Sequence, residues 1–556
     1  MDAQTNDAPA VRQEARPAQV DVVVVGAGFS GLYLILKLRK LGLSFRVFEA
    51  GSGVGGTWYW NRYPGARCDV ESMQYSYSFD EDLQQEWKWS ETFAPQPEIL
   101  DYANHVADRF DLRRSIEFET RVTAAHYDAA ARRWRVETDR GEAVSARFCI
   151  MATGCLSAPR APEFPGLESF RGETYHTGAW PHEGVDLSGK RVAVIGTGSS
   201  AIQAIPVIAK EAGHLTVFQR TPNYSIPART KPLTPEYEAE WKSNYAERRE
   251  IARHTAVGNY YDRSKLSALD VSDEERERIF KDRWAVGGTR FMTAFKDLAV
   301  NQAANDTAAD FVRRQIREIV KDPATAELLA AKDYPIGTKR ICADSGYFET
   351  YNRPNVRLVD INAHPIREIT AEGLVAGEEA HGFDVIVFAT GFDAMTGTLL
   401  RIDIRGRGGE TLADAWEAGP RTYLGLMTAG FPNMFMITGP GSPSVLSNMM
   451  VSIEQHVDWV TDCLDWLRDR GVEEMEATLE AQDAWVEHGN EVAYKTLYPS
   501  AASWYMGANI EGKPRVFMPY IGGVGVYREK CDAVAAAGYE GFRLAGGAAD
   551  KEAAAD

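Results

Sequence analysis

Two glycine-rich motifs are the residues of this sequence best suited to chemistry, and both are of the dinucleotide-binding type. The first, Gly26-Ala27-Gly28-Phe29-Ser30-Gly31, follows the apolar run 21–25 and opens a segment of helical spacing, 29–41. Its glycines permit a tight turn and close approach of the backbone to a pyrophosphate, and N–H groups at the helix start face the phosphates. A second strand, 45–48, ends at Glu49, whose carboxylate suits the hydroxyls of an unphosphorylated ribose. This motif therefore predicts a site for FAD or NAD.

The second motif, Gly196-Thr197-Gly198-Ser199-Ser200-Ala201, lies between a strand at 191–195 and a helix expected over 199–211. The strand that follows, 215–218, ends in Gln219-Arg220-Thr221 without an acidic residue. An arginine there pairs with a 2′-phosphate that a carboxylate would repel, so we expect NADPH, with Lys339 as a second positive charge. The alternative for Arg220 is a solvated surface arginine.

A third glycine loop, Gly53-Val54-Gly55-Gly56-Thr57-Trp58, favours FAD at the first motif. In disulfide reductases a redox-active cysteine pair follows such a loop, whereas here the nearest cysteine, Cys68, has no partner. A thiol–disulfide relay is therefore disfavoured, and oxygen is the expected electron acceptor.

Composition excludes several classes of function. The net charge of −18 disfavours nucleic-acid binding, and the six cysteines form no CxxC pair and no metal-like spacing. No apolar run is long enough to span a membrane, and the N-terminus has no secretory signal. We therefore expect a cytoplasmic protein that binds no metal, membrane or nucleic acid and is a monomer or weak homo-oligomer.

The expected fold class is α/β, with two Rossmann-like dinucleotide-binding domains and a helical insertion. Two strands that each end in Ala-Thr-Gly, at 149–154 and 385–391, are interpreted as chain crossings between the domains. The predicted parts are a FAD domain (19–155 and 384–545), an NADPH domain (156–230 and 334–383), a helical insertion (231–333), and disordered tails (1–18 and 546–556). The insertion is either a plain structural insert or a lid over the substrate.

The segment 170–181 carries the most specific pattern. Its residues Phe170, Gly172, His176, Trp180 and Pro181, placed just before the second motif, resemble the fingerprint of the type I Baeyer–Villiger monooxygenases. The N-oxygenating flavin monooxygenases carry a shorter version without Trp-Pro. The resemblance spans about 20–542 and is greatest to the phenylacetone and steroid monooxygenase branch. It leaves open whether His176 acts chemically or orders a linker between the domains.

This resemblance implies a reaction. NADPH reduces FAD, the flavin forms a C4a-peroxyflavin with O2, and the peroxide attacks a ketone to give an ester or lactone. By the same resemblance Arg340 stabilises the anions, Asp69 holds Arg340, and Trp504 lies on a loop that closes over the nicotinamide. The ketone pocket is placed at Ser444, Val445 and Leu446, which suits aryl, bulky or cyclic ketones, with sulfoxidation as a side activity. The alternatives are an N- or S-oxygenating monooxygenase and a non-oxygenating NADPH oxidase or redox sensor.

Together these arguments give a set of predicted binding residues. For FAD they are Gly26, Gly28, Phe29, Ser30, Gly31, Glu49, Gly56, Thr57, Trp58, Asp69, Tyr75 and Met449. For NADP they are Arg67, Thr197, Gly198, Ser199, Ser200, Gln203, Arg220, Thr221, Lys339, Arg340 and Trp504.

Overall fold

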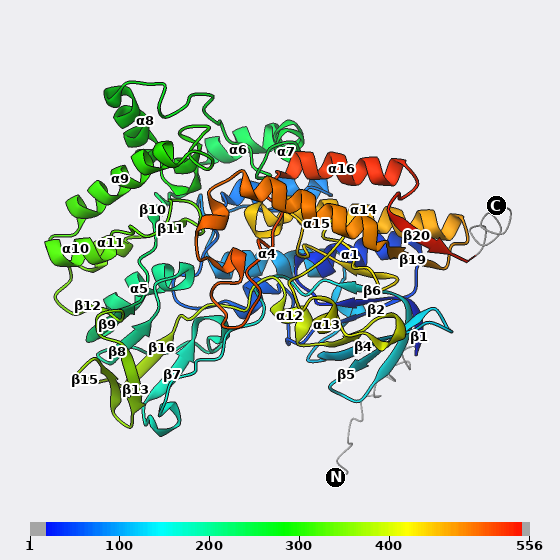
Figure 1. The fold of residues 1–556 in the computed structure, drawn as a ribbon, viewed down its shortest axis with the longest axis horizontal. Helices are drawn as coiled ribbons and strands as arrows, with labels where there is room; N and C mark the ends of the chain where they lie inside the picture. The colour runs from blue at the N-terminus through cyan, green and yellow to red at the C-terminus, as the bar shows by residue number, and fades with distance from the viewer. Residues whose placement is uncertain (1–17, 547–556) are drawn as a thin grey trace, which may run out of the picture.

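The structure is a computed structural model that describes residues 18–546. The tails expected to be disordered, 1–18 and 546–556, lie outside these residues except for Ala18 and Gly546. Two sheets lie side by side, each covered by helices (Figure 1). The expected α/β class with two Rossmann-like units is confirmed.

The first sheet is built around β1 (Gln19–Val25), whose valines 22–24 are fully buried because helices and strands cover both faces. It pairs in parallel with β2 (Phe45–Phe48) and β6 (Ala143–Met151), and α1 (Phe29–Leu41) connects β1 to β2 as the apolar spacing predicts. The remaining strands are β3 (Ile116–Glu117), β4 (Val122–Asp128), β5 (Arg133–Thr138), β17 (Asp403–Arg405) and β18 (Met434–Met436). Its covering helices include α2 (Thr57–Trp60), α3 (Glu81–Glu86), α4 (Gln96–Arg109), α12 (Gly397–Leu400) and α13 (Leu412–Ala415).

The second sheet repeats this plan in parallel strands. Its order is β12 (Val356–Asp360), β9 (His214–Gln219), β8 (Arg191–Ile195), β16 (Val385–Phe388) and β7 (Glu173–His176). The helix after β8 is α5 (Ser199–Glu211), at the predicted bounds. Smaller pieces are β10 (Ser225–Pro227), β11 (Cys342–Asp344), α11 (Tyr347–Thr350), β13 (Ile366–Thr370), β14 (Gly373–Ala376) and β15 (Glu379–Gly382).

The segment 170–181 was expected in a linker, and this is wrong for its centre. Residues 173–176 form β7, the edge strand of the second sheet, in parallel register with β16. Three of its four residues, Glu173, Thr174 and His176, are polar, so a search for apolar runs does not find this strand, which forms by pairing with buried β16.

The two Ala-Thr-Gly segments meet the two glycine motifs in the same way. A Cβ on Gly26 would overlap the carbonyl oxygen of Ala152, and one on Gly196 would overlap that of Ala389. Both glycines also have a left-handed φ, near +109° and +112°. Each crossing strand therefore presses its end against the turn of a motif, and only glycine tolerates that approach.

The segment 231–333 is helical, with no strand among its described residues, and it divides between two cores. Trp241 and Tyr245 of its first helices bury in the core of the first sheet, whereas Phe280 and Phe311 bury in the core of the second. Its helices are α6 (Pro235–Ser243), α7 (Tyr245–Arg253), α8 (Asp273–Val286), α9 (Gln302–Ile319) and α10 (Pro323–Leu329). The insertion thus connects both halves of the molecule.

The C-terminal part returns to the first half. The long helix α14 (Met449–Asp469) packs along α1, and α15 (Leu479–Tyr494) and α16 (Val524–Ala536) lie beside it (Figure 1). β19 (Glu474–Ala477) and β20 (Phe542–Ala545) pair as a short antiparallel two-stranded sheet. Among residues 18–546, no helix combines the length and apolar character needed to cross a membrane.

A direct contact joins the halves at the loop 63–67. The Gln203 amide on α5 accepts a hydrogen bond from Tyr63 Oη at 2.8 Å and donates one to the Arg67 carbonyl oxygen at 3.0 Å. Gly65 lies between them with φ of +79°, and a Cβ there would overlap the Gln203 carbonyl oxygen. The loop can therefore lie against α5 only without a side chain at this position.

This contact predicts a specific loss of stability in Gly65→Ala. We expect the substitution to lower the thermal unfolding midpoint by more than Gly42→Ala, a control with φ of +68° and open space around its Cβ position. Both variants carry left-handed strain of roughly 1–2 kcal/mol, but only Gly65→Ala adds an overlap with the second half. Differential scanning calorimetry measures both midpoints, and equal shifts would contradict this account.

Candidate active site

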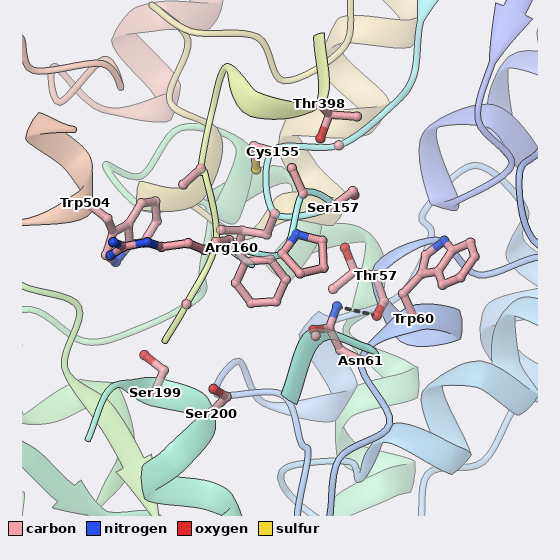
Figure 2. A pocket seen from close by; sticks show the side chains of 18 of the residues that line it. Thr57, Trp60, Asn61, Cys155, Ser157, Arg160, Ser199, Ser200, Thr398 and Trp504 are labelled. Atoms are coloured by element: carbon pink, nitrogen blue, oxygen red, sulfur yellow. Dashed lines mark hydrogen bonds between the residues drawn. The ribbon is translucent and has the colours of Figure 1, made fainter. Parts of the chain in front are cut away.

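One large cleft, of about 1110 Å³, opens at the carboxyl ends of the parallel strands that carry the two glycine motifs. Both glycine motifs contribute to its lining, together with Asp69, Arg340 and Trp504. Figure 2 shows Ser199 and Ser200 at the lower side of the cavity, Thr57 and Asn61 at the right, and Trp504 on the left, opposite Thr57 and Asn61. The switch-point position is where open α/β sheets bind their ligands.

The first motif forms a cradle for a dinucleotide. Gly28 is the N-cap of α1 and lies directly against Gly56, so that no side chain separates the two glycine loops. Glu49 is 5% exposed, and its carboxylate accepts hydrogen bonds from the N–H groups of Ala27 (2.8 Å) and Gly51 (2.7 Å). Burial raises the pKa of Glu49. A carboxylate fixed beside a bare helix N-terminus fits a ribose next to a pyrophosphate.

An aromatic wall continues from this cradle. Trp58 Nε1 donates to Tyr75 Oη at 3.1 Å, and the two rings meet edge to face. Phe29, buried at the start of α1, meets Tyr75 in the same way. Met449 begins α14 at the edge of this wall. All predicted residues of the first site except Gly31 thus line the cleft. Gly31 lies behind it, packed against the carbonyl oxygen of Gly26, and shapes the turn.

The second motif leaves its cradle open. Gly198 is the N-cap of α5, and a Cβ there would meet no atom within 4 Å, because it points into the cleft. Thr197 Oγ1 donates to the carbonyl oxygen of Thr221 at 2.9 Å, which holds the end of β9 against the motif. Ser199 and Ser200 follow at the helix start. The geometry fits a second phosphate group at the α5 N-terminus.

Arg220 and Lys339 lie together at the end of β9, as expected for a phosphate site. Burial and the Arg220 charge lower the pKa of Lys339, whose ammonium group lies 4.5 Å from the ring centre of Tyr334. Arg220 is exposed at the cleft. The neighbouring charges of Arg220 and Lys339, of which Lys339 also feels the carboxylate of Asp333, favour an anionic group such as a 2′-phosphate.

Arg340 and Asp69, 271 positions apart, form a bidentate ion pair. Arg340 Nε lies 3.0 Å from Asp69 Oδ2 and Nη2 lies 2.7 Å from Oδ1, while Nη1 donates to the Val445 carbonyl oxygen at 2.8 Å. The Asp69 carboxylate raises the pKa of Arg340. The Arg340 side chain is 32% exposed, and that part lines the cleft. The permanently charged guanidinium group of Arg340 is therefore held in place by Asp69 with its exposed part facing the cleft.

The predicted pocket loop and Trp504 approach this arginine from the C-terminal part. Val445 is buried and holds Arg340 through its carbonyl, Ser444 is buried with its hydroxyl near Cys155, and Leu446 is half-buried. Trp504 lies 4.2 Å from the Tyr505 ring, centre to centre, and borders the cleft. Of the expected NADP contacts, Gln203 and Arg67 form the contact between the halves described above.

His176 has both ring nitrogens in contacts that order the chain. Its Nδ1 accepts from the Gly178 N–H at 2.9 Å, and its Nε2 lies 3.2 Å from Thr390 Oγ1. Burial lowers its pKa. The side chain thus ties β7 to the crossing segment at 389–392, and Trp180 is buried beside Tyr175. These contacts favour the ordering role over a chemical one.

Several lining residues were missed from the sequence. Thr120, Arg121 and Val122 lie at the start of β4, next to Glu49, and Arg160 donates to the Asn509 carbonyl oxygen near Trp504 (Figure 2). The Ala-Thr-Gly signal could have found Ala152, Thr153 and Gly154, which line the cleft beside the first motif. No sequence signal marks the others, because they belong to no recognisable motif. Among the described residues, no group of three or more His, Cys, Asp or Glu could hold a metal ion.

Comparisons with known proteins show which family this chain belongs to. Residues 23–310 match the pyridine nucleotide-disulphide oxidoreductase family. A Baeyer–Villiger monooxygenase of Pseudooceanicola batsensis is 47% identical over 94% of this chain and 96% of its own, and a phenazine N-monooxygenase of Lysobacter antibioticus is 44% identical over 94% and 97%. A solved steroid monooxygenase bound to NADP shares 56% identity with a TM-score of 0.91, covering 95% of this chain and 100% of that one. The chain therefore belongs to the type I Baeyer–Villiger monooxygenase family, as the segment 170–181 predicts.

Proposed function

We propose that this protein oxygenates ketones to esters or lactones in the cleft, with Arg340 as the residue that stabilises the reacting anions. The observation that carries the proposal is the bidentate Arg340–Asp69 pair placed between two nucleotide cradles. Membership of the Baeyer–Villiger monooxygenase family supports oxygenation of ketones as the reaction, and the position of Arg340 supports the cleft as the place where it occurs. Arg340 and Asp69 are accordingly the proposed catalytic residues.

The cofactors are FAD and NADPH, as expected. Solved relatives were obtained with NADP, or with FAD and NADP together. We place FAD at the cradle of Gly28, Gly56 and Glu49, and NADPH at that of Gly198, with its 2′-phosphate on Arg220 and Lys339. When bound, FAD reduced by NADPH activates O2 for insertion beside a ketone carbonyl.

Arg340 is suited to hold an anionic oxygen without giving up its proton. A guanidinium stays charged at any working pH and offers five N–H donors, of which three are used by Asp69 and Val445. The remaining donors belong to Nη1 and Nη2. Because Asp69 fixes the guanidinium group before reaction, little reorganisation is needed when negative charge develops beside it.

The other residues around Arg340 exclude water and define the substrate. Val445, Met449 and Trp504 line the cleft near Arg340. Leu446 and Tyr505 belong to the same apolar cluster but lie behind this lining. This lining suits aryl, bulky or cyclic ketones, and a thioether would fit as a side substrate for sulfoxidation. Cytoplasmic location and a monomeric or weakly associated state stay predictions.

N-oxygenation of an aromatic amine is a second candidate. A relative named as a phenazine N-monooxygenase is almost as similar to this chain as the relative named as a Baeyer–Villiger monooxygenase. The same nucleotide sites would serve both reactions. A panel of ketones, thioethers and aromatic N-heterocycles, with product identification by mass spectrometry, decides between them, and N-oxide formation faster than that of any ester or lactone would favour the second candidate.

Removal of the Arg340 charge tests the proposed role. We expect Arg340→Ala to bind both cofactors but to lose ester or lactone formation by about 10²–10³-fold, as for loss of one oxyanion-stabilising donor. Asp69→Asn keeps the shape of its side chain and should lose activity as well, because the guanidinium is no longer held by a charge. Product yield and NADPH oxidation are measured together, with Arg353→Ala, an exposed arginine, as control. Unchanged product formation in Arg340→Ala would remove the residue from the reaction.

Arg220 should decide the choice between NADPH and NADH. Loss of a charge-assisted contact to phosphate weakens binding by about ten- to a hundredfold, so Arg220→Gln should raise the KM for NADPH by that factor and leave the KM for NADH unchanged. Steady-state kinetics with both coenzymes measure this, and Arg353→Gln is the matched control. An equal effect on both coenzymes would place the 2′-phosphate elsewhere.

A further inference from the structure

A second cavity, of about 200 Å³, lies outside the cofactor cleft, between α7 of the insertion and the helices α14 and α16. Figure 1 shows α7 next to the start of α16, and two backbone hydrogen bonds join the segment after α7 to Val524 and Gly525. Three arginines reach this cavity: Arg249 and Arg253 from α7, and Arg528 from α16. None of the nucleotide-site residues lines it.

Arg249 is buried with a donor left over. It is 7% exposed, and its terminal nitrogens donate to the Gln74 carbonyl oxygen at 3.0 Å and to Ser76 Oγ at 2.6 Å. Its Nε has no hydrogen-bond partner among the described residues, and the same is true of the buried Nε of Arg528. An unpaired buried donor is costly, so the charge of these two guanidinium groups is only partly compensated by hydrogen bonds within the protein.

The two carboxylates at the cavity do not fill this role. The oxygens of Glu454 accept from the Ser78 N–H and hydroxyl, and Asp458 Oδ1 accepts from Tyr33 Oη and Lys37 Nζ at 2.8 Å each. No ion pair joins either carboxylate to Arg249 or Arg528 in the described part of the chain. The cavity is lined by three arginines and two carboxylates, and Glu250 pairs with Arg253 outside it.

We propose that this cavity binds a small inorganic oxyanion of the phosphate type. Such an anion presents acceptors in several directions, and guanidinium groups match it with paired, charge-assisted hydrogen bonds. A water molecule occupies about 30 Å³ of liquid, so the space holds a phosphate with its hydration but no nucleotide. The anion bridges α7 to α16 and is coupled, through Arg249, to the loop 73–76 that carries the flavin-facing Tyr75.

The test measures binding of inorganic phosphate to the holoenzyme. FAD and saturating NADP+ fill the cofactor cleft, so that phosphate cannot bind at the nucleotide sites. We expect saturable phosphate binding by isothermal titration calorimetry and a phosphate-dependent rise of the unfolding midpoint at constant ionic strength, since a ligand specific for the folded state stabilises it. Loss of one guanidinium in Arg528→Gln should weaken phosphate binding by about tenfold or more.

Two further variants keep the test decisive. Arg253→Gln changes a half-exposed side chain at the cavity mouth, so it should fold normally and should also weaken phosphate binding. Arg470→Gln removes the same charge at the far, exposed end of α14 and should bind phosphate like the unchanged protein. A cavity that holds only water would give no saturable binding in the unchanged protein. That result, or equal affinity in all variants, would overturn the proposal.

Discussion

The ion pair between Arg340 and Asp69 is the interaction on which the arrangement of the active site depends. Asp69 belongs to the first half, Arg340 follows the helical insertion, and the carbonyl of Val445 that completes the contact comes from the C-terminal part. A charge in a partly buried position is stable only when its partner is held in place. The pair therefore forms only once both sheets and the insertion have packed, and the fold in turn determines which face of the arginine remains open to the cleft.

Close backbone contacts at three glycines also position the two nucleotide motifs. Gly26 and Gly196 each accept the end of a crossing strand, and Gly65 lets one half lie against α5 of the other. At all three positions a side chain would overlap a backbone carbonyl. The contacts at Gly26 and Gly196 fix each motif against the neighbouring strand of its own sheet. Only the Gly65 contact crosses between the halves, which the helical insertion also connects.

The central parallel strands β1, β2, β8, β9 and β16, the end of β6 and the two motif helices were predictable, because buried parallel strands are continuous apolar runs and their turns need glycine. The shorter parallel strands and β12 were not predicted. The antiparallel strands β4, β5 and β13–β15 were not predicted, since their half-exposed residues show no such runs. The edge strand β7 was interpreted as a linker for the same reason. In the site, the spacing of the motifs identified the residues within them. Thr120, Arg121 and Arg160 belong to no motif, so only the fold shows that they line the cleft.

The sequence alone determined the two nucleotide motifs, the acid after one and the arginine after the other, because these features are local and follow from how a strand, a turn and a helix meet a phosphate. The resemblance at 170–181 added the reaction class. The resemblance also paired Asp69 with Arg340. Tertiary structure alone decided that Arg340 also binds the Val445 carbonyl, that His176 is occupied by Gly178 and Thr390, and that the insertion divides between two cores. Such contacts join segments far apart in the chain, and no local spacing encodes which distant side chains packing will bring together.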